Sequence, residues 1–340
     1  MAGLRFLISG GGGAGRAVAS VVQADGRGEV IAFAEPSQQQ WERIRKQFPN
    51  VLIGADYEDL LHLSKPNAVV IACPDHLHAE QALAAMDLGC HVLIEKPLTT
   101  TVADARRLIE KAKARGVHAM VDHTLRYVPP WCQMSQAARR GEIGRIFYIE
   151  GSYIHDMWNY YSPQGKSYTP WRADSKAPQN ILLGGGCHPI DLILSTIESE
   201  AAEVFAFSNK LSIPEFPADD CYIVVLKFED QTLAKVMVTC GCSGHGMGEG
   251  FLAVYGTEGA LWQGKKIRRG AEAIPFEPPE SKTMVGGHGW GGSVPDFLSL
   301  VTGKIENPIP LREGARTVAV CEAALRSIAT GLSQRPERFS

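Results

Sequence analysis

The stretch Arg5–Ala17, RFLISGGGGAGRA, decides the fold of this chain. It begins with the apolar run Phe6–Ile8, which is typical of a buried parallel strand. Glycines follow at the spacing G-x-G-x-x-G, and the residues after them have a pattern compatible with a helix. In this arrangement the first glycine permits a tight turn, the second lets a pyrophosphate approach the backbone, and the third lets the helix pack closely on the strand. The predicted pyrophosphate site consists of Gly10, Gly12, Gly13, Ala14 and Gly15.

An acidic residue follows the glycines at the distance that a dinucleotide site requires. The apolar run Val30–Ala34 ends in Glu35, about 20 residues after the glycines. A carboxylate there accepts hydrogen bonds from the adenosine ribose and repels a 2′-phosphate. No Arg or Lys follows directly, because the next residues are Pro36, Ser37 and three Gln. We therefore expect NAD in preference to NADP. Two alternatives remain. One is that the glycines form a turn that binds no ligand, and the other is that Glu35 is an ordinary surface carboxylate at the end of a strand.

Length, composition and charge limit the classes of protein to which this chain can belong. The chain has 340 residues, of which 45% are apolar, and this suits two domains with sizeable cores. The net charge of −3 provides no basic field for nucleic acid or an anionic membrane, and no apolar run approaches the ~18 residues of a membrane span. The eight cysteines are scattered and lack zinc-type spacing. We expect a cytoplasmic protein with no metal site, nucleic-acid partner or membrane anchor.

Strand-like and helix-like segments alternate in the first part of the chain. This alternation predicts a doubly wound parallel sheet, whose ligands bind beyond the carboxyl ends of the strands. The segments that fall at predicted strand ends are Gly10–Gly15, Glu35, Cys73–His78, Glu95–Pro97 and Asp122–Tyr127. The sequence therefore predicts a Rossmann-type α/β domain over residues 1–124, with its informative residues on one edge of the sheet.

The pattern changes in the second part of the chain. Arg145–Tyr153 alternates like a strand with one buried face, and several segments between residues 202 and 263 do the same. We expect an α+β domain over residues 125–340, with an open, mainly antiparallel sheet and, after about Gly144, helices only around His188–Ile197 and Gly314–Gly331. Whether the C-terminal helix packs back on the first domain is left open. Because one face of such a sheet lacks helices, we expect a homodimer or homotetramer formed through it.

Several motifs give the chain a family resemblance. They are GGGGAG, AEP around Glu35, CPDHLHAEQALAAMDLGCHVLIEKPL, LRYVPP, PWR, GGCHPIDLI and YGTEGAL. With them the chain resembles the Gfo/Idh/MocA oxidoreductases, the glucose–fructose oxidoreductase and inositol dehydrogenase type, over nearly its whole length. The resemblance implies a Rossmann domain followed by an open-sheet domain. It also implies oxidation of a ring hydroxyl of a sugar, sugar derivative or inositol to a ketone with NAD(P).

Two residues are the leading candidates for catalysis. Lys96, which stands between a predicted strand and Pro97, matches the lysine of the family's EKP motif, where it contacts the reacting hydroxyl. His188 matches the family histidine that faces the nicotinamide, and a near-neutral imidazole suits a general base. If a helix begins near Cys187, Asp191 shares a face with His188 and orients the imidazole or binds a substrate hydroxyl. A surface lysine and a structural histidine are the alternatives.

Further site residues follow from the strand ends and the resemblance. Besides the glycine loop and Glu35, the residues expected to line the cofactor are Cys73, Pro74, His76, His78, Glu95, Lys96 and Arg126. Those expected to contact the substrate are Lys96, Tyr127, Trp158, Trp171, Arg172, His188 and His288. Aromatic faces flanked by hydrogen-bonding groups suit a pyranose or inositol ring, although such stripes also occur in cores and interfaces. His288 lies in a glycine-rich stretch that we expect to form a loop closing over the site.

The chain departs from the family pattern at one position near His188. Many relatives have an acid four residues before this histidine, where this chain has Gly184. Either Asp191 takes over the role of that acid, or another acid such as Asp156 or Asp174 folds in. Two other functions also stay open: an NAD-dependent glycoside-processing enzyme with transient oxidation, and a catalytically silent NAD-binding regulator.

Overall fold

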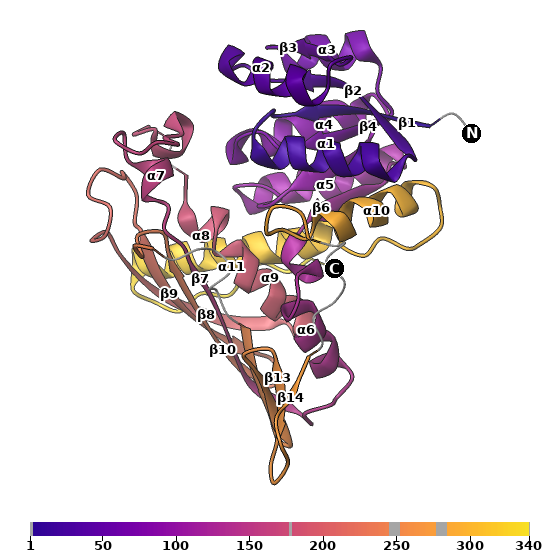
Figure 1. Ribbon diagram of the computed structural model, residues 1–340. Coiled ribbons are helices and arrows are strands. Elements are labelled where there is room, and N and C mark those ends of the chain that lie inside the picture. Colours follow the sequence, from indigo (N-terminus) through magenta and orange to yellow (C-terminus); the bar gives the residue numbers. More distant parts are fainter. Residues whose placement is uncertain (1–2, 177–178, 245–251, 277–283, 340) are drawn as a thin grey trace. The chain divides into compact units, whose positions relative to one another are not determined.

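The computed structural model describes residues 3–176, 179–244, 252–276 and 284–339 (Figure 1). The chain forms two compact units. The first unit is Met1–Tyr127 together with Ser281–Ala315, and the second is Val128–Glu280 together with Arg316–Ser340. A segment from late in the sequence thus belongs to the first unit. The division of the chain after residue 124 stays a prediction of the sequence.

The first unit is built on a six-stranded parallel sheet in the order β3-β2-β1-β4-β5-β6. Its strands are β1 (Leu4–Ser9), β2 (Gly28–Ala34), β3 (Leu52–Gly54), β4 (Ala68–Ile71), β5 (His91–Glu95) and β6 (Ala119–Asp122). The strand order reverses between β1 and β4, which is the point where doubly wound sheets bind their ligands. This topology confirms the predicted Rossmann-type domain.

Helices cover both faces of this sheet (Figure 1). They are α1 (Gly13–Asp25), α2 (Gln38–Gln47), α3 (Tyr57–Ser64), α4 (His78–Asp87), α5 (Val102–Arg115) and α10 (Trp290–Val301), with the short 3-10 helices η1 (Asp75–Leu77) and η2 (Thr124–Tyr127). Helix α1 packs against α10, whereas α4 packs against α3 and α5. Because parallel crossovers are right-handed, the reversal between β1 and β4 puts these two groups of helices on opposite faces.

Helix α10 completes the first unit from a distant part of the sequence. Phe297 packs edge-on against Phe6 of β1, with ring centroids 6.3 Å apart. Arg27 donates hydrogen bonds of 3.0 Å to the carbonyl oxygen of Pro295 and of 2.8 Å to the hydroxyl of Ser299. The glycine-rich stretch around His288 was expected to be a loop throughout, and this was wrong for its last part, because α10 begins at Trp290.

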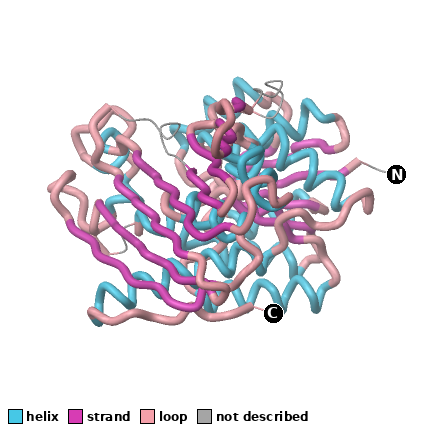
Figure 2. The backbone as a smooth tube through the Cα atoms, turned by 90° about the horizontal axis from the view of Figure 1, so that it is seen from below, coloured by secondary structure: helices cyan, strands magenta, loops and turns pink. Residues whose placement is uncertain are grey.

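The second unit contains an eight-stranded sheet in the order β14-β13-β12-β11-β7-β10-β9-β8 (Figure 2). Its strands are β7 (Ile146–Ile154), β8 (Ala201–Asn209), β9 (Cys221–Phe228), β10 (Leu233–Thr239), β11 (Leu252–Gly256), β12 (Gly259–Trp262), β13 (Lys265–Arg268) and β14 (Ile274–Pro275). Neighbouring strands are antiparallel, except for β7 and β10, which are parallel. The predicted open, mainly antiparallel sheet is thereby confirmed.

The long strands of this sheet bury alternate side chains. In β9, Val224 and Leu226 are buried, whereas Val225 between them is exposed. Phe207 of the neighbouring β8 is 67% exposed, and Leu233 of β10 is exposed as well. One face of the sheet therefore packs into the core of the unit, and the other presents large apolar side chains outward, as the alternating sequence predicts.

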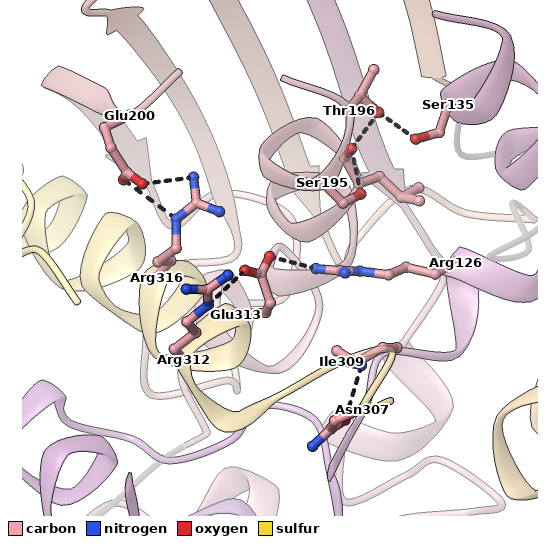
Figure 3. A network of polar contacts seen from close by, with 11 residues as sticks. Arg126, Ser135, Ser195, Thr196, Glu200, Asn307, Ile309, Arg312, Glu313 and Arg316 are labelled. Atoms are coloured by element: carbon pink, nitrogen blue, oxygen red, sulfur yellow. Dashed lines mark hydrogen bonds and ion pairs between the residues drawn. The ribbon is translucent and has the colours of Figure 1, made fainter. Parts of the chain in front are cut away.

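The helices of the second unit are α6 (Trp131–Arg139), α7 (Trp158–Tyr161), α8 (Ile181–Gly184), α9 (Cys187–Thr196) and most of α11 (Leu311–Thr330), with the 3-10 helix η3 (Pro170–Ala173). Helix α9 is almost entirely buried and packs against β7, β10 and α6. The hydroxyls of Ser135 in α6 and Thr196 in α9 are 2.8 Å apart (Figure 3). The expectation of only two helices after about residue 144 was wrong, since α7, α8 and α10 form there as well. No helix in the described ranges is long and apolar enough to cross a membrane.

Candidate active site

The glycine loop between β1 and α1 has the backbone geometry of a pyrophosphate site. Gly10 has a φ of +92°, and a Cβ atom there would lie 2.3 Å from the carbonyl oxygen of Ala72. A Cβ atom on Gly15 would lie 1.9 Å from the carbonyl oxygen of Gly10, so only glycine lets α1 approach β1 this closely. Cβ atoms on Gly12 and Gly13 would meet nothing within 4 Å. No side chain caps the N-terminus of α1, so its N–H groups suit a phosphate.

Glu35 lies beside this loop, as its spacing predicts. Its buried carboxylate accepts hydrogen bonds of 2.8 Å from the backbone N–H groups of Gly11 and Ser37. Arg16, which the sequence did not single out, donates a hydrogen bond to the carbonyl oxygen of Gly11. Burial and the charge of Arg43 lower the pKa of Arg16, whereas Glu35 acts to raise it. A carboxylate held next to a glycine loop is the arrangement that receives an adenosine ribose.

His78 joins two of the loops at the strand ends. Its Nδ1 atom lies 2.7 Å from the carbonyl oxygen of Pro97, and its Nε2 atom lies 3.1 Å from that of Cys73. The buried imidazole therefore fixes the spacing between the loop after β4 and the loop after β5. Burial raises the pKa of the Cys73 thiol to about 12, so this thiol is neutral. Pro74 and His76 lie in the same loop, and contacts of these four residues with a cofactor stay predictions.

Lys96 follows β5 directly and is half-buried. The buried carboxylate of Glu95 accepts hydrogen bonds of 2.9 Å from the indole of Trp290 and of 3.2 Å from the backbone N–H of Lys96. Asp122 stands opposite Glu95 in the register of β5 and β6 and is fully buried. Burial raises the pKa of both carboxyl groups, and the charge of Glu95 raises that of Asp122 further. A positive charge on Lys96 acts to lower both pKa values.

The segment after β6 is tied to other parts of the first unit. Arg126 forms an ion pair with Glu313 at the start of α11, with a nitrogen–oxygen distance of 3.3 Å (Figure 3). The hydroxyl of Tyr127 donates a hydrogen bond of 2.8 Å to the carboxylate of Asp296 in α10. Both side chains therefore have structural partners, and their contacts with cofactor or substrate stay predictions.

His288 precedes α10 and packs on it. Its imidazole stacks on the ring of Trp290, with centroids 4.3 Å apart, and its Nδ1 atom lies 3.3 Å from the hydroxyl oxygen of Thr124. A Cβ atom on the adjacent Gly289 would lie 2.3 Å from the carbonyl oxygen of Thr124. Because Trp290 also binds Glu95, His288 belongs to the same packed group of residues as the candidate lysine.

The candidate base lies in the second unit, in the first turn of α9. His188 is 2% exposed, and its imidazole stacks on the ring of Tyr153 from β7, with centroids 6.0 Å apart and planes inclined by 18°. The hydroxyl oxygen of Tyr153 lies 2.9 Å from Nδ1 of His155 in turn. Asp191 is also buried and follows His188 in the same helix. Tyr153, which the sequence did not single out, thus contacts two histidines.

Trp171 and Arg172 lie together in η3. The guanidinium carbon of Arg172 lies 4.6 Å from the centroid of the Trp171 ring, which is a cation–π contact. The same guanidinium donates a hydrogen bond to the side-chain oxygen of Gln179. Sequence reasoning missed Gln179, because a glutamine outside a motif gives no signal of its own. Trp158 begins α7 and is 39% exposed.

The predicted catalytic residues fall in different units. Lys96 belongs to the first unit, and His188 and Asp191 belong to the second. The joint action of these three residues on one substrate therefore stays a prediction. Among the described residues, no group of three or more His, Cys, Asp and Glu side chains could hold a metal ion.

Comparison with known families assigns both parts of the chain. Residues 4–123 match the oxidoreductase family with an NAD-binding Rossmann fold, and residues 131–262 match the GFO/IDH/MocA C-terminal domain. The chain is therefore an oxidoreductase-type protein with an NAD(P)-binding Rossmann domain. It belongs to the Gfo/Idh/MocA oxidoreductase family.

Individual relatives are distant. The chain is 27% identical over 255 residues to the levoglucosan dehydrogenase of Pseudarthrobacter phenanthrenivorans, covering 68% of this chain and 64% of the relative. It is 27% identical over 245 residues to the 1,5-anhydro-D-fructose reductase of Ensifer adhaerens, covering 72% of this chain and 70% of the relative. The chain thus spans about two thirds of the length of these curated relatives. The WlbA dehydrogenase from Bordetella pertussis, solved with NADH and UDP-GlcNAcA, superposes with a TM-score of 0.83 at 20% identity over 99% of this chain and 100% of that chain, which shows a shared fold.

Proposed function

We propose that the protein is an NAD-dependent dehydrogenase that oxidises a ring hydroxyl of a sugar, sugar derivative or inositol to a ketone. The observation that carries this proposal is the position of Lys96. Lys96 follows the carboxyl end of β5, on the sheet edge that also holds the glycine loop and Glu35. A half-buried cation on that edge suits the stabilisation of a forming alkoxide. Two curated relatives are a levoglucosan dehydrogenase and a 1,5-anhydro-D-fructose reductase, and this supports a ring polyol as substrate.

The residues divide the chemistry between them. The glycine loop and Glu35 would hold NAD, which would supply a hydride acceptor for the carbinol carbon. Lys96 donates a hydrogen bond to the hydroxyl oxygen and stabilises the negative charge that develops there. The imidazole of His188 accepts the hydroxyl proton, so the carbinol becomes a ketone and the imidazole becomes an imidazolium. Asp191 orients the imidazole or binds a second substrate hydroxyl.

The preference for NAD over NADP rests on Glu35. Both oxygens of its carboxylate accept hydrogen bonds from the backbone, one of them from the glycine loop. A fixed negative charge at this position binds the two ribose hydroxyls of NAD and repels the 2′-phosphate of NADP. Arg16 lies nearby, and its guanidinium is directed to the carbonyl oxygen of Gly11.

Assembly and compartment follow from two further observations. The outward face of the eight-stranded sheet carries Phe207, Val225 and Leu233, all exposed, and such a face is typical of a subunit interface. We therefore propose a homodimer or homotetramer formed through this face. Each of the eight cysteines is a free thiol, which supports a location in the reducing cytoplasm.

The decisive experiment is a substrate panel. The purified protein is incubated with NAD or NADP and with inositols, aldoses, sugar acids and glycosides, and formation of the reduced cofactor is followed by its absorbance. A substrate-dependent rise with NAD supports the proposal. A catalytically silent NAD-binding regulator, which the glycine at position 184 favours, gives no rise with any compound. A glycoside-processing enzyme consumes glycosides without net formation of NADH.

A further inference from the structure

Two of the three consecutive glycines before Cys187 and His188 leave room that other side chains fill. A Cβ atom on Gly184 would lie 2.5 Å from the side-chain nitrogen of Gln179 and 2.9 Å from its amide carbon. A Cβ atom on Gly185 would lie between 2.5 and 3.0 Å from three ring atoms of Tyr153. Gln179 therefore occupies the space of the side chain that position 184 lacks, and Tyr153 occupies that of position 185. The space in which the family resemblance implies an acid therefore holds the neutral amide of Gln179.

The amide of Gln179 is fixed in one orientation. Gln179 is only 6% exposed, and its side-chain oxygen accepts hydrogen bonds from the hydroxyl of Tyr161, at 2.8 Å, and from the guanidinium of Arg172. Its backbone N–H also donates a hydrogen bond of 2.9 Å to the carbonyl oxygen of Arg172. Tyr161 is itself buried against Phe216, with ring centroids 4.3 Å apart. Gln179 is thus a rigid support for the side chain of Arg172.

Arg172 forms no ion pair among the residues that the structure describes, and its side-chain contacts are the Gln179 oxygen and the face of Trp171. Asp156 and Asp174, the two acids that the sequence offered in place of the one missing at position 184, accept hydrogen bonds from backbone N–H groups of other residues. Asp156 accepts hydrogen bonds from Trp158 and Gly244, at 3.1 and 2.9 Å, and Asp174 accepts one of 2.8 Å from Lys176.

Tyr153 links Arg172 to the candidate base. Burial raises the pKa of the Tyr153 hydroxyl, and the charge of Arg172 is close enough to act against that rise. Tyr153 in turn stacks on the imidazole of His188. A guanidinium that is half-buried, supported by a neutral amide and near the candidate base is suited to bind an anion with two parallel hydrogen bonds.

We propose that Arg172, positioned by Gln179, binds an anionic group of the substrate, a carboxylate or a phosphate. The substrate is therefore an acidic derivative of a polyhydroxylated ring, such as a sugar acid or a sugar phosphate, and not a neutral polyol. This inference rests on the proposed function, because it takes the region around His188 as the substrate site. Gln179 acts as a positioning residue, and Arg172 determines specificity.

The test compares substrates that differ only in charge. A hexuronic acid, its methyl ester, the parent neutral sugar and the sugar phosphate are each offered with NAD, and kcat/KM is measured. We expect the acid or the phosphate to exceed the neutral compounds by at least about tenfold, the size of the loss when one hydrogen bond to a charged group is removed. Preference for the carboxylate over the phosphate, or the reverse, identifies the anion.

Three variants locate the effect. Gln179→Glu has nearly the same shape and places a negative charge against Arg172, so the preference for the anionic substrate falls at least about tenfold while the neutral sugar is little affected. Arg172→Met removes the charge and has the same effect. Arg140→Ala removes an exposed arginine of the same unit, which pairs with Glu142, and leaves the preference unchanged. Thermal unfolding of each variant shows whether it folds. If Arg172→Met does not fold, the substrate preference of Gln179→Glu decides whether the anion site exists.

The outcomes separate this inference from the proposed function. If neutral sugars are oxidised as well as the acids, or if Gln179→Glu leaves their ratio unchanged, the anion site is contradicted and the dehydrogenase stands. If no compound yields NADH, the proposed function fails, and calorimetric binding of the hexuronic acid decides about Arg172. If the wild type binds the hexuronic acid and Arg172→Met does not, the anion site is supported. If the wild type does not bind it, or Arg172→Met binds it equally well, the anion site is contradicted.

Discussion

Glu95 and Asp122 face each other across β5 and β6, at the carboxyl ends of the two strands, and both carboxyl groups are buried. Their pKa values are raised by burial, and the charge of Glu95 adds to the rise at Asp122. The folded protein therefore binds protons more tightly at this pair than the unfolded chain does. The stabilisation that the protonated pair provides is fully present only below the ordinary carboxyl pKa of about 4 and is lost as the pH rises from there.

The first prediction concerns this carboxyl pair. Asp122→Asn keeps the shape of the side chain and removes its negative charge, so Tm at neutral pH should rise by about 2–4 °C, which corresponds to about 1 kcal/mol in a protein of this size. The gain should shrink as the pH falls toward about 4, where the wild-type pair is protonated. Thermal unfolding over this pH range measures both effects. Asp174→Asn, at an exposed position, is the control. A lower Tm for Asp122→Asn at neutral pH would contradict the assignment.

The second prediction concerns the choice of cofactor. Glu35→Ala removes the carboxylate that holds Gly11 and that repels a 2′-phosphate, so the ratio of kcat/KM for NAD to that for NADP should fall by at least about tenfold. Glu29→Ala changes an exposed glutamate on β2, the strand that ends just before Glu35, and should leave the ratio as it is. A wild-type enzyme that already prefers NADP would show that Glu35 does not set the choice.

The third prediction concerns the catalytic pair. Lys96→Met and His188→Ala should each lower kcat by about 10²-fold or more, because each removes a positioned electrostatic or acid–base group. Affinity for NAD, measured by calorimetry, should stay near that of the wild type, since the adenosine end rests on the glycine loop and Glu35. The double variant should lose less than the product of the two single losses. Lys113→Met, on the exposed side of α5, is the matched control.

The pH profile separates the roles of these two residues. The wild-type rate should fall at acid pH, because a protonated His188 cannot accept the hydroxyl proton. In His188→Ala this acid limb should be lost or moved. Full activity of Lys96→Met means that the site is assigned wrongly. Full activity of His188→Ala alone means that the base lies elsewhere, and Asp191 is then the first residue to change.

The fourth prediction concerns assembly. Val225→Asp places a charge on the outward face of the eight-stranded sheet, beside Phe207 and Leu233 on the neighbouring strands, and should dissociate the homodimer or homotetramer. Light scattering at micromolar concentration measures the mass of both proteins. Glu203→Asp, a conservative change at an exposed position of β8, should keep the wild-type mass. A wild-type protein that is already monomeric would remove the basis of this prediction.

The parts of the fold that could be predicted from sequence are those with strong local signals. The apolar runs before Gly10 and Glu35 became β1 and β2, and Gly116 caps α5 as its residue type suggests. Helix α10 was missed because it contains glycines and Pro295, which are poor local helix formers. Its conformation is stabilised by distant contacts, such as that of Phe297 with Phe6.

The site shows the same division between local and distant causes. Spacing to the glycines was enough to pick out Glu35, since the structure ties it to Gly11. It could not pick out Gln179, whose position depends on the space left by Gly184. The departure at position 184 was visible in the sequence as a missing acid. That the missing side chain leaves room for a glutamine could only be seen in three dimensions.

Helix α10 also bears on how the chain is made. Arg27 and Pro295, which are joined by a hydrogen bond, are separated by 268 residues in the sequence. A ribosome that has synthesised the first 127 residues has made every strand of the first sheet, but not the helix that covers Phe6 and binds Glu95. The nascent first unit therefore keeps an apolar face open while nearly the whole second unit is translated. This interval is when the chain depends most on chaperones that shield such faces.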